Sequence, residues 1–229
     1  MIRAVVFDVV GTLLHAEPGV AEAYHRIGKR HGSELTEQEI RSRFRQVMTE
    51  RPLSPRTSEA EELLFWRETV AGVLGNVDDP EQCFQDLYQY FATPAAWRID
   101  PLAESLLAAL RARDCSTALA SNFDVRLHSV IAGTPGLQGF DHVLISSQVG
   151  WRKPASEFFE AVIHALQLPA SSILMVGDDL QNDILPARRL GIQALHLSPG
   201  NQSETDPGEC TINSLTDVLK WCRVHGRNE

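Results

Sequence analysis

Residues 98–229 alternate between short apolar runs and longer amphipathic segments. The short apolar runs predict strands, whereas the amphipathic segments predict helices. Strands are predicted at residues 116–120, 142–145, 173–176 and 193–197, and helices at residues 102–113, 125–132, 155–166, 182–190 and 214–225. Alternating strands and helices are typical of a parallel sheet with helices on both faces. The predicted fold class is therefore α/β.

A first strand is predicted near the start of the sequence, where the run Ile2–Phe7 is apolar except for Arg3 and half of its residues are β-branched. Such a run is typical of a strand that is buried on both faces, as in a parallel sheet. Asp8 follows this strand directly, and Gly11 and Thr12 come shortly after it. Because open α/β sheets bind ligands at the carboxyl ends of their strands, Asp8 is expected to lie at a ligand-binding edge.

Residues 15–97 have a different character, with four predicted helices at residues 20–32, 36–51, 58–75 and 80–93. Two of them begin with the pattern of a capping box, Thr36 with Glu39 and Ser58 with Glu61. An all-helical block after a single strand predicts an inserted small bundle. Its expected core residues include Phe65, Trp66, Leu87, Tyr88 and Phe91. We therefore predict an α/β core at residues 1–14 and 98–229, and a helical cap at residues 15–97.

Composition limits the classes of protein to which the chain can belong. Its 229 residues are 43% hydrophobic and 22% charged, which is ordinary for a globular protein. The formal net charge of −9 argues against a nucleic-acid partner and against an anionic membrane surface. No apolar run approaches the roughly 20 residues that cross a bilayer. Four cysteines without a CxxC pattern favour free thiols and a cytoplasmic location.

Polar side chains gather where the predicted strands end and the following helices begin. They are Asp8, Thr12, Ser121, Asn122, Lys153, Asp178, Asp179 and Asp183. Parallel strands bring these positions to one edge of the sheet. Carboxylate oxygens suit Mg²⁺, a carboxylate can attack phosphorus to form an aspartyl-phosphate, and hydroxyl and ammonium groups can hold phosphate oxygens. The residues alone therefore indicate metal-assisted phosphoryl transfer.

Four motifs, in this order along the chain, resemble those of the haloacid dehalogenase-like hydrolase superfamily. FDVVGTL is similar to its first motif, ALASN to its second, Lys153-Pro154 to its third and VGDDLQND to its fourth. Four motifs in register are much more specific than one. PGVAEAYHRIGKRHG, SNFDVRL and GWRKPASEFF resemble more closely the haloacid dehalogenase-like hydrolase domain-containing protein 3 group. The resemblance implies a Rossmann-like parallel sheet core with an inserted helical cap, and Mg²⁺ as the cofactor.

The resemblance also implies a role for each matching residue. The expected catalytic residues are Asp8 as nucleophile, Ser121 as a ligand of the transferring group and Lys153 as the cation that neutralises charge between nucleophile and substrate. The expected substrate-binding residues are Thr12, Ser121, Asn122 and Lys153. The expected metal ligands are Asp8, the backbone carbonyl of Val10, Asp178 and Asp183, with Asp179 as an alternative acid. The expected partner is a small phosphorylated substrate, and the sequence does not indicate an oligomeric state.

Position 10 departs from the phosphatase pattern of this superfamily. A second aspartate there protonates the leaving group and later activates water, and Val10 can do neither. The loss of positioned acid–base help costs roughly 10²–10⁴ in rate, which is smaller than the total rate enhancement of most enzymes. We therefore expect a phosphatase that is weakened at this step and biased towards good leaving groups.

Val10 leaves two other functions open. A 2-haloacid dehalogenase of this superfamily also lacks the second aspartate, since a halide needs no proton to leave. However, Asp178 and Asp179 beside Asp8 would repel an anionic haloacid unless a metal neutralised them. A catalytically weak or silent relative that binds a phosphate ligand or a protein partner is the other alternative. A phosphonatase also lacks this aspartate but would need a lysine in the cap, where Lys29 is the candidate. A histidine could replace the missing acid, and the candidates are His15, His25 and His31.

Overall fold

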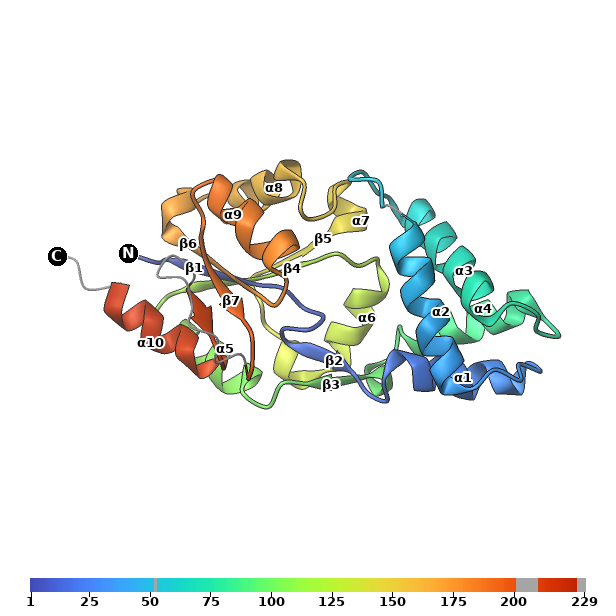
Figure 1. The fold of residues 1–229 in the computed structure, drawn as a ribbon. Coiled ribbons are helices and arrows are strands. Elements are labelled where there is room, and N and C mark those ends of the chain that lie inside the picture. Colours follow the sequence, from blue (N-terminus) through green and yellow to red (C-terminus); the bar gives the residue numbers. More distant parts are fainter. Residues whose placement is uncertain (52, 201–209, 226–229) are drawn as a thin grey trace.

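The computed structural model describes residues 1–51, 53–200 and 210–225. Six parallel strands form one sheet in the order β5-β4-β1-β6-β7-β8 (Figure 1). They are β1 Ala4–Phe7, β4 Ser116–Ser121, β5 His142–Ile145, β6 Ile173–Gly177, β7 Gln193–Leu197 and β8 Thr211–Ile212. Phe7 of β1 is in register with Leu119 of β4 and with Val176 of β6. The carboxyl ends of these three strands therefore meet at the middle of one edge.

Helices cover both faces of the sheet, because successive residues of a strand point to opposite faces. Val5 and Phe7 pack in one apolar core with α5, α6 and α10, and Ala4 and Val6 pack in a second core with α8 and α9. These helices are α5 Ala103–Arg111, α6 Arg126–Ala132, α8 Ser156–Leu166, α9 Leu185–Arg189 and α10 Thr216–His225. The predicted α/β class, a parallel sheet with helices on both faces, is confirmed.

Four further helices form a bundle beside the sheet, at the right of Figure 1. They are α1 Val20–Arg30, α2 Glu37–Glu50, α3 Glu59–Leu74 and α4 Pro80–Tyr90. Apolar residues from all four helices form a core of their own. Thr36 and Glu39 form the predicted capping box at the start of α2. At the start of α3, the Ser58 hydroxyl accepts a hydrogen bond from the backbone N–H of Glu61, which is one half of such a box.

A two-stranded ribbon that the sequence did not reveal connects the bundle to the sheet. β2 Leu14–Ala16 pairs with β3 Trp97–Ile99 in antiparallel fashion, with Leu14 opposite Ile99. The chain enters the bundle after β2 and returns through β3, so the two crossings lie side by side (Figure 1). Strands of three residues show too little periodicity to be recognised from sequence.

Several element boundaries also differ from the predictions. β1 begins at Ala4 rather than Ile2, and the helix predicted at residues 182–190 begins as a π-helical turn at Leu180–Ile184 that continues into α9. A short helix, α7 Ser146–Val149, and strand β8 were not predicted. Three 3₁₀ turns lie at Pro94–Ala96, Pro135–Leu137 and Ala170–Ser172. From residue 201 onward, the polar loop predicted at residues 199–209 lies outside the described residues.

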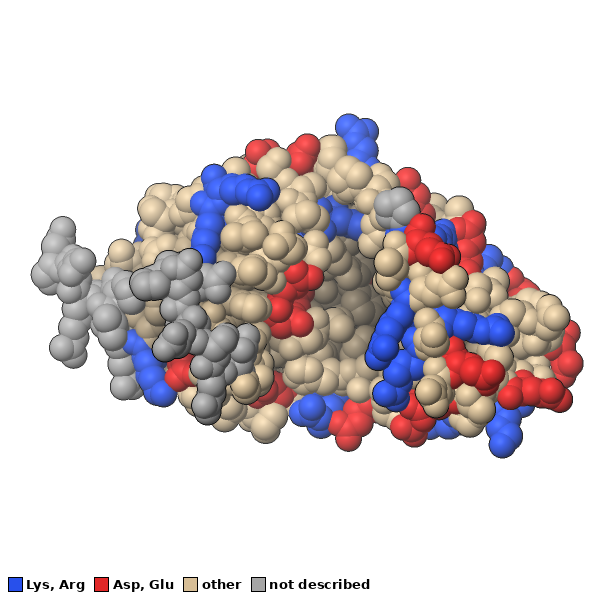
Figure 2. Space-filling model, in the orientation of Figure 1, with Lys and Arg blue, Asp and Glu red and all other residues tan. Residues whose placement is uncertain are grey.

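A hollow separates the carboxyl edge of the sheet from the helical bundle (Figure 2). Acidic side chains gather on its sheet side, and lysine and arginine side chains gather on its bundle side. Within the described ranges, no helix is long and apolar enough to cross a membrane. The hollow lies where the predicted site residues converge.

Candidate active site

The site is centred on the ammonium group of Lys153, which lies in the loop before α8. Its Nζ atom donates to Asp8 Oδ1 at 2.6 Å, to Asp183 Oδ1 at 2.6 Å and to the carbonyl of Ala120 at 3.0 Å. Lys153 is 4% exposed and Asp8 is 6% exposed. Burial disfavours the ammonium, but the two carboxylates outweigh this effect and raise the pKa of Lys153. Lys153 is therefore a charged group that holds Asp8 at the end of β1.

Asn122 fixes the backbone of Lys153 from the end of β4. Its Nδ2 atom donates to the Lys153 carbonyl at 2.9 Å, and its Oδ1 atom accepts from the Lys153 N–H at 2.8 Å. The neighbouring Ser121 is 1% exposed, and its hydroxyl makes no hydrogen bond with any described residue. This pair thus supplies one positioning side chain and one hydroxyl that is available to a ligand.

Thr12 links two of the carboxylates. Its Oγ1 atom lies 3.1 Å from Asp8 Oδ2 and 3.1 Å from Asp178 Oδ1. A hydroxyl has one proton, so Thr12 donates to one of these carboxylates at a time. Thr12 and Asn122 were both expected to bind substrate, but here their polar atoms contact other residues of the site. Direct contact of either residue with substrate stays a prediction.

Asp8, Asp178 and Asp183 form an acidic cluster in which one oxygen of each lies within 4.8 Å of the others. Together with Lys153 the cluster has a net charge of −2 when all four groups are ionised. Burial, with Asp8 nearby, raises the pKa of Asp178, and burial raises the pKa of Asp183 to about 7 despite its contact with Lys153. The cluster thus lacks positive charge, and its all-oxygen donor set fits a divalent cation such as Mg²⁺.

Asp179, the alternative metal ligand, has a different role in the structure. Its carboxylate accepts hydrogen bonds from the backbone N–H groups of Gln181 and Asn182 at 2.8 and 2.9 Å, and from Asn182 Nδ2 at 2.6 Å. Burial raises the pKa of Asp179, but these hydrogen bonds outweigh it and the net pKa is lowered. Asp179 therefore caps the turn that begins at Leu180, and that turn brings Asp183 to the cluster.

Two glycines inside the predicted motifs, Gly11 and Gly177, allow the carboxylates to approach, a role that the sequence did not predict. Gly11 has φ +99°, and a Cβ atom there would overlap the Asp178 carboxylate. A Cβ atom at Gly177 would likewise overlap the Asp183 carboxylate. Both glycines lie inside the motifs quoted above, and this position in the sequence was the signal that could have indicated their role.

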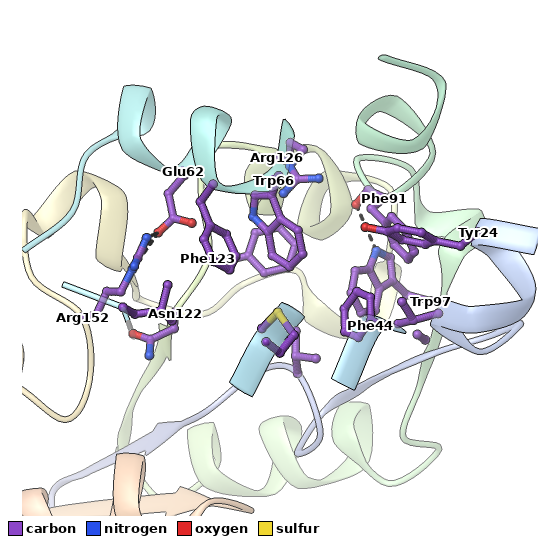
Figure 3. Close-up of a pocket in the computed structure, with 16 residues that line it drawn as sticks. Tyr24, Phe44, Glu62, Trp66, Phe91, Trp97, Asn122, Phe123, Arg126 and Arg152 are labelled. Atoms are coloured by element: carbon purple, nitrogen blue, oxygen red, sulfur yellow. Dashed lines mark hydrogen bonds and ion pairs between the residues drawn. The ribbon is translucent and has the colours of Figure 1, made fainter. Parts of the chain in front are cut away.

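A cavity of about 300 Å³ is lined by residues of the bundle and of the loops that follow β1 and β4 (Figure 3). Val10, which is 40% exposed, lines it together with Asn122 and Phe123. Most of the remaining wall belongs to the helical bundle. Phe65 was expected in the bundle core and lines this cavity instead, whereas Leu87 lies in the bundle core as expected. No described histidine lines the cavity, and neither does Lys29.

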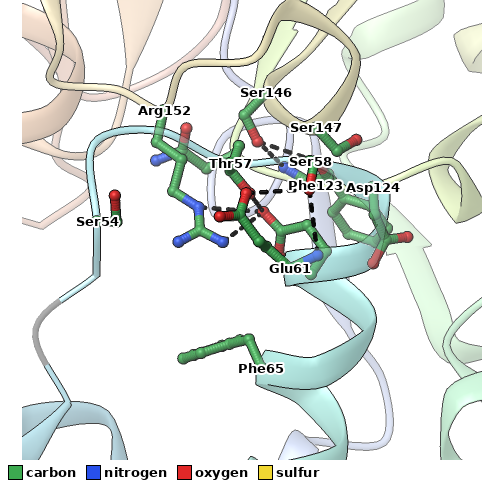
Figure 4. A network of polar contacts seen from close by, with 12 residues as sticks. Ser54, Thr57, Ser58, Glu61, Phe65, Phe123, Asp124, Ser146, Ser147 and Arg152 are labelled. Atoms are coloured by element: carbon green, nitrogen blue, oxygen red, sulfur yellow. Dashed lines mark hydrogen bonds and ion pairs between the residues drawn. The ribbon is translucent and has the colours of Figure 1, made fainter.

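Two buried ion pairs that sequence reasoning did not find lie in the walls of this cavity. Arg126 contacts both oxygens of Asp124, with Nη2 2.7 Å from Oδ2. Arg152 Nη2 lies 2.7 Å from Glu62 Oε1, which also accepts from the Thr57 hydroxyl at 2.9 Å (Figure 4). Glu62 is in α3 and Arg152 is next to Lys153, so this pair joins the bundle to the loop that carries the central ammonium.

A second set of polar contacts holds the same end of α3. Glu59, the first residue of α3, accepts hydrogen bonds from the Ser147 hydroxyl at 2.5 Å and from the Val125 N–H at 3.1 Å. Backbone bonds from Thr57 N–H to the Gly150 carbonyl and from Arg152 N–H to the Pro55 carbonyl lie alongside. The start of α3 is therefore the part of the bundle that is attached most directly to the loops of the sheet.

Comparison with known proteins agrees with this architecture. A profile of the haloacid dehalogenase-like hydrolases matches residues 2–191. The chain is 28% identical over 229 residues to the haloacid dehalogenase-like hydrolase domain-containing protein 3 of Danio rerio, covering 95% of both chains. It is 31% identical over 133 residues to a ribulose-1,5-bisphosphate 5-phosphatase of Halopiger xanaduensis, covering 52% of this chain and 56% of that protein.

Solved structures of two related proteins show the same fold. The HAD-hydrolase YfnB of Bacillus subtilis, bound to magnesium, has a TM-score of 0.74 at 17% identity and covers 96% of this chain and 98% of its own. An L-2-haloacid dehalogenase of Xanthobacter autotrophicus has a TM-score of 0.72 at 23% identity and covers 100% of both chains. Since the matched region runs from before β1 to the end of α9, and so includes every member of the acidic cluster, the chain belongs to the haloacid dehalogenase-like hydrolase family.

Proposed function

We propose that this protein is a Mg²⁺-dependent phosphatase of small phosphorylated compounds, with Asp8 as the nucleophile. The observation that carries the proposal is the arrangement around Asp8. Lys153 holds one oxygen of its carboxylate and Thr12 lies beside the other, within a cluster that, with Lys153, has a net charge of −2 when all four groups are ionised. A buried, oriented carboxylate beside a site for a divalent cation is what attack on a phosphate anion requires. The phosphatase among the relatives supports the same reaction class.

In the proposed reaction, an oxygen of Asp8 bonds to phosphorus while the bond to the leaving oxygen breaks with its electron pair. Lys153 offsets the charge near Asp8, and the Ser121 hydroxyl donates to an oxygen of the transferring group. Water then bonds to phosphorus, the bond to Asp8 breaks, and phosphate and a proton are released. Mg²⁺, held by Asp8, the Val10 carbonyl, Asp178 and Asp183, would supply the positive charge that the cluster lacks.

Val10 determines which substrates are suitable. Its side chain cannot donate a proton to the leaving oxygen, so that oxygen departs as an anion. Aryl and acyl phosphates have leaving groups that are stable as anions, and alkyl phosphates do not. We therefore expect the rate to fall steeply as the pKa of the leaving group rises, because positioned acid catalysis contributes roughly 10²–10⁴ where it is present.

A phosphatase panel measured with and without Mg²⁺ tests this proposal. The native protein should release phosphate from aryl and acyl phosphates only with Mg²⁺, and Asp8→Asn should reduce turnover to background. Asp217→Asn, the same change at an ion-paired surface position in α10, is the matched control and should be fully active. Activity that survives in Asp8→Asn would exclude Asp8 as nucleophile. A native protein that is inactive across the panel would favour the silent, ligand-binding alternative.

A 2-haloacid dehalogenase is the second candidate, and Val10 is the observation that favours it. A haloacid has a carboxylate that needs a cation. However, the two guanidinium groups that line the cavity are paired with Asp124 and Glu62, and the acidic cluster repels anions until a metal neutralises it. Chloride release from chloroacetate in the presence of EDTA would establish this activity, and its absence at high enzyme concentration would dismiss it.

We also propose that the helical bundle acts as a cap domain over the site, with residues 15–97 as the cap and residues 1–14 and 98–229 as the core. The separate apolar core of the bundle and the adjacent crossings at β2 and β3 support this division. We further propose a cytoplasmic location. The four cysteines, which are free thiols in the structure, fit a reducing compartment.

A further inference from the structure

The cavity beside Val10 is enclosed mainly by aromatic rings. Tyr24, Phe44, Phe65, Trp66 and Phe91 contribute rings from the bundle. Trp97 of β3 and Phe123, which follows β4, contribute rings from the sheet side. Figure 3 labels all of these rings except that of Phe65, and it shows Asn122 and Arg152 together at one side of the cavity. The cavity is therefore an apolar, aromatic space whose wall includes Val10, two residues after Asp8.

The charged groups in the cavity wall have no unpaired charge to offer a ligand. Arg126 is bound to both oxygens of Asp124, and its guanidinium lies 3.8 Å from the centre of the Tyr88 ring. Arg152 is paired with Glu62. A second phosphate or a carboxylate on the substrate would therefore find no free cation in this wall, whereas an uncharged planar group would contact rings throughout.

The Tyr24 hydroxyl is the exception in this apolar lining. Tyr24 is 2% exposed, and its hydroxyl makes no hydrogen bond with any described residue. In Figure 3 the hydroxyl end of the ring points into the cavity, towards Trp66. Burial raises the pKa of Tyr24, so the hydroxyl keeps its proton and remains a donor. A donor without a partner at the wall of a cavity is suited to an acceptor on a ligand.

Size limits the ligand further. An apolar protein cavity of roughly 150 Å³ takes up one benzene molecule. The cavity here, about 300 Å³, has room for two fused rings. Val10 forms the part of the wall closest to Asp8 in sequence, so a phosphate bound at Asp8 would place its leaving oxygen near Val10 and the rest of its leaving group among the rings.

We propose that this cavity binds the leaving group of the substrate, and that this group is a planar bicyclic aromatic with a hydrogen-bond acceptor at its far end for Tyr24. The inference rests on the proposed function and specifies its substrate class as aryl phosphates. It also accounts for Val10, because an aryl oxide departs without a proton donor and an apolar side chain packs against its ring.

Equilibrium binding of the leaving alcohols tests the cavity without any turnover. In isothermal titration calorimetry, 2-naphthol should bind at least about tenfold more tightly than phenol, because the second ring is also buried. Met48→Trp, which fills the rim of the cavity, should weaken 2-naphthol binding. Leu64→Trp is the matched control, because Leu64 is exposed on α3 and does not line the cavity. Equal binding of phenol and 2-naphthol, or equal binding to both variants, would overturn the proposal.

Tyr24→Phe tests the hydrogen bond. Umbelliferone and 2-naphthol are similar in size, but umbelliferone has a carbonyl at the end opposite its hydroxyl group. The variant should lose about fivefold in affinity for umbelliferone, as expected for one hydrogen bond, and should keep its affinity for 2-naphthol. An equal change for both ligands would overturn the assignment of Tyr24.

Turnover separates this inference from the proposed function. Phenol and 2-naphthol are similar leaving groups, so a higher kcat/KM for 2-naphthyl phosphate than for phenyl phosphate reports the cavity rather than the chemistry. The preference should disappear in Met48→Trp and persist in Leu64→Trp. Hydrolysis without any such preference would refute the cavity proposal and leave the phosphatase intact. Tight 2-naphthol binding without hydrolysis of either ester would support the cavity and refute the phosphatase.

Discussion

Two residues close together in the sequence, Asp8 and Val10, divide the proposed chemistry between them. Asp8 is buried and held by Lys153, so its geometry suits attack on phosphorus. Val10 is 40% exposed towards the aromatic cavity and lacks any group that transfers a proton. At the residue scale, the chain therefore retains a nucleophile for attack on phosphorus and lacks a proton donor for the leaving group.

Val10→Asp should restore that help. The rate with alkyl phosphates should rise by roughly 10²-fold or more, because positioned acid catalysis is worth about that amount. Aryl phosphates should gain much less, since their leaving groups need no proton. The measurement is kcat/KM across a series of esters with different leaving-group pKa values. Val10→Asn is the control, because asparagine has the shape of aspartate without a titratable proton. An equal gain in both variants would contradict the role of position 10 in proton transfer.

At the element scale, the start of α3 and the loop before α8 are held together by the buried pair of Glu62 and Arg152. These residues are 5% and 6% exposed. The loop continues directly into Lys153, so the pair connects the bundle to the residue that positions Asp8. Removing one member of a buried ion pair leaves the other charge unpaired, which costs more than replacing both members.

Arg152→Met should therefore lower the free energy of unfolding by about 3–5 kcal/mol at neutral pH, because Glu62 is left buried without its partner. The double change Glu62→Met with Arg152→Met should recover most of that loss. Urea unfolding curves of the native protein and of both variants measure the difference. A double variant as unstable as the single one would show that packing rather than the unpaired charge was lost.

The pair should also make stability depend on pH with a definite sign. Burial raises the pKa of Glu62 above 4.5, against the opposing attraction of Arg152. Between 4.5 and the raised pKa, the folded state binds more protons than the unfolded chain, so this group lowers the free energy of unfolding as pH rises through that window. Glu62→Gln removes this dependence.

The free energy of unfolding of the native protein should thus exceed that of Glu62→Gln by most near pH 4, and this difference should shrink towards neutral pH. Chemical denaturation of both proteins at a series of pH values measures the difference directly. A difference in the free energy of unfolding that grows with pH would mean that the attraction of Arg152 for the Glu62 carboxylate exceeds the cost of burying it.

At the scale of the whole molecule, the site lies between two bodies of structure. The sheet edge supplies acidic groups and the bundle supplies an aromatic wall, and the chain crosses between them at β2 and β3. The acidic side of this hollow concentrates negative charge in the folded state, whereas the unfolded chain spreads the same carboxylates apart. A cation that binds the assembled cluster should therefore stabilise the folded protein.

Mg²⁺ should raise the melting temperature. At a free concentration of about 100 times Kd it contributes about 2.7 kcal/mol, or about 5–10 °C for a chain of this length. EDTA should reverse the shift, and NaCl at equal ionic strength should not reproduce it. Asp178→Asn should reduce the shift, whereas Asp217→Asn on α10 should not. A melting temperature that Mg²⁺ leaves unchanged would contradict the assignment of the cluster as a metal site.

The sequence by itself determined the order of the strands and helices other than β2, β3, β8 and α7, and it placed Asp8, Ser121, Lys153 and Asp178 at strand ends or in the loops that follow. These are local signals, because an apolar run, its length and the residue that ends it are neighbours in the chain. Parallel strands then bring their carboxyl ends to one edge, so a prediction made strand by strand is enough to group the residues. The short ribbon of β2 and β3 was missed because three residues carry almost no pattern.

Tertiary structure decided what depends on residues far apart. It placed Asp183 rather than Asp179 beside Asp8, because a π-helical turn capped by Asp179 rotates the following acid towards Lys153. It also paired Glu62 with Arg152 and turned Phe65 towards the cavity instead of the bundle core. The packing of α3 against a loop 90 residues later pairs Glu62 with Arg152, and no periodicity in either segment records that packing.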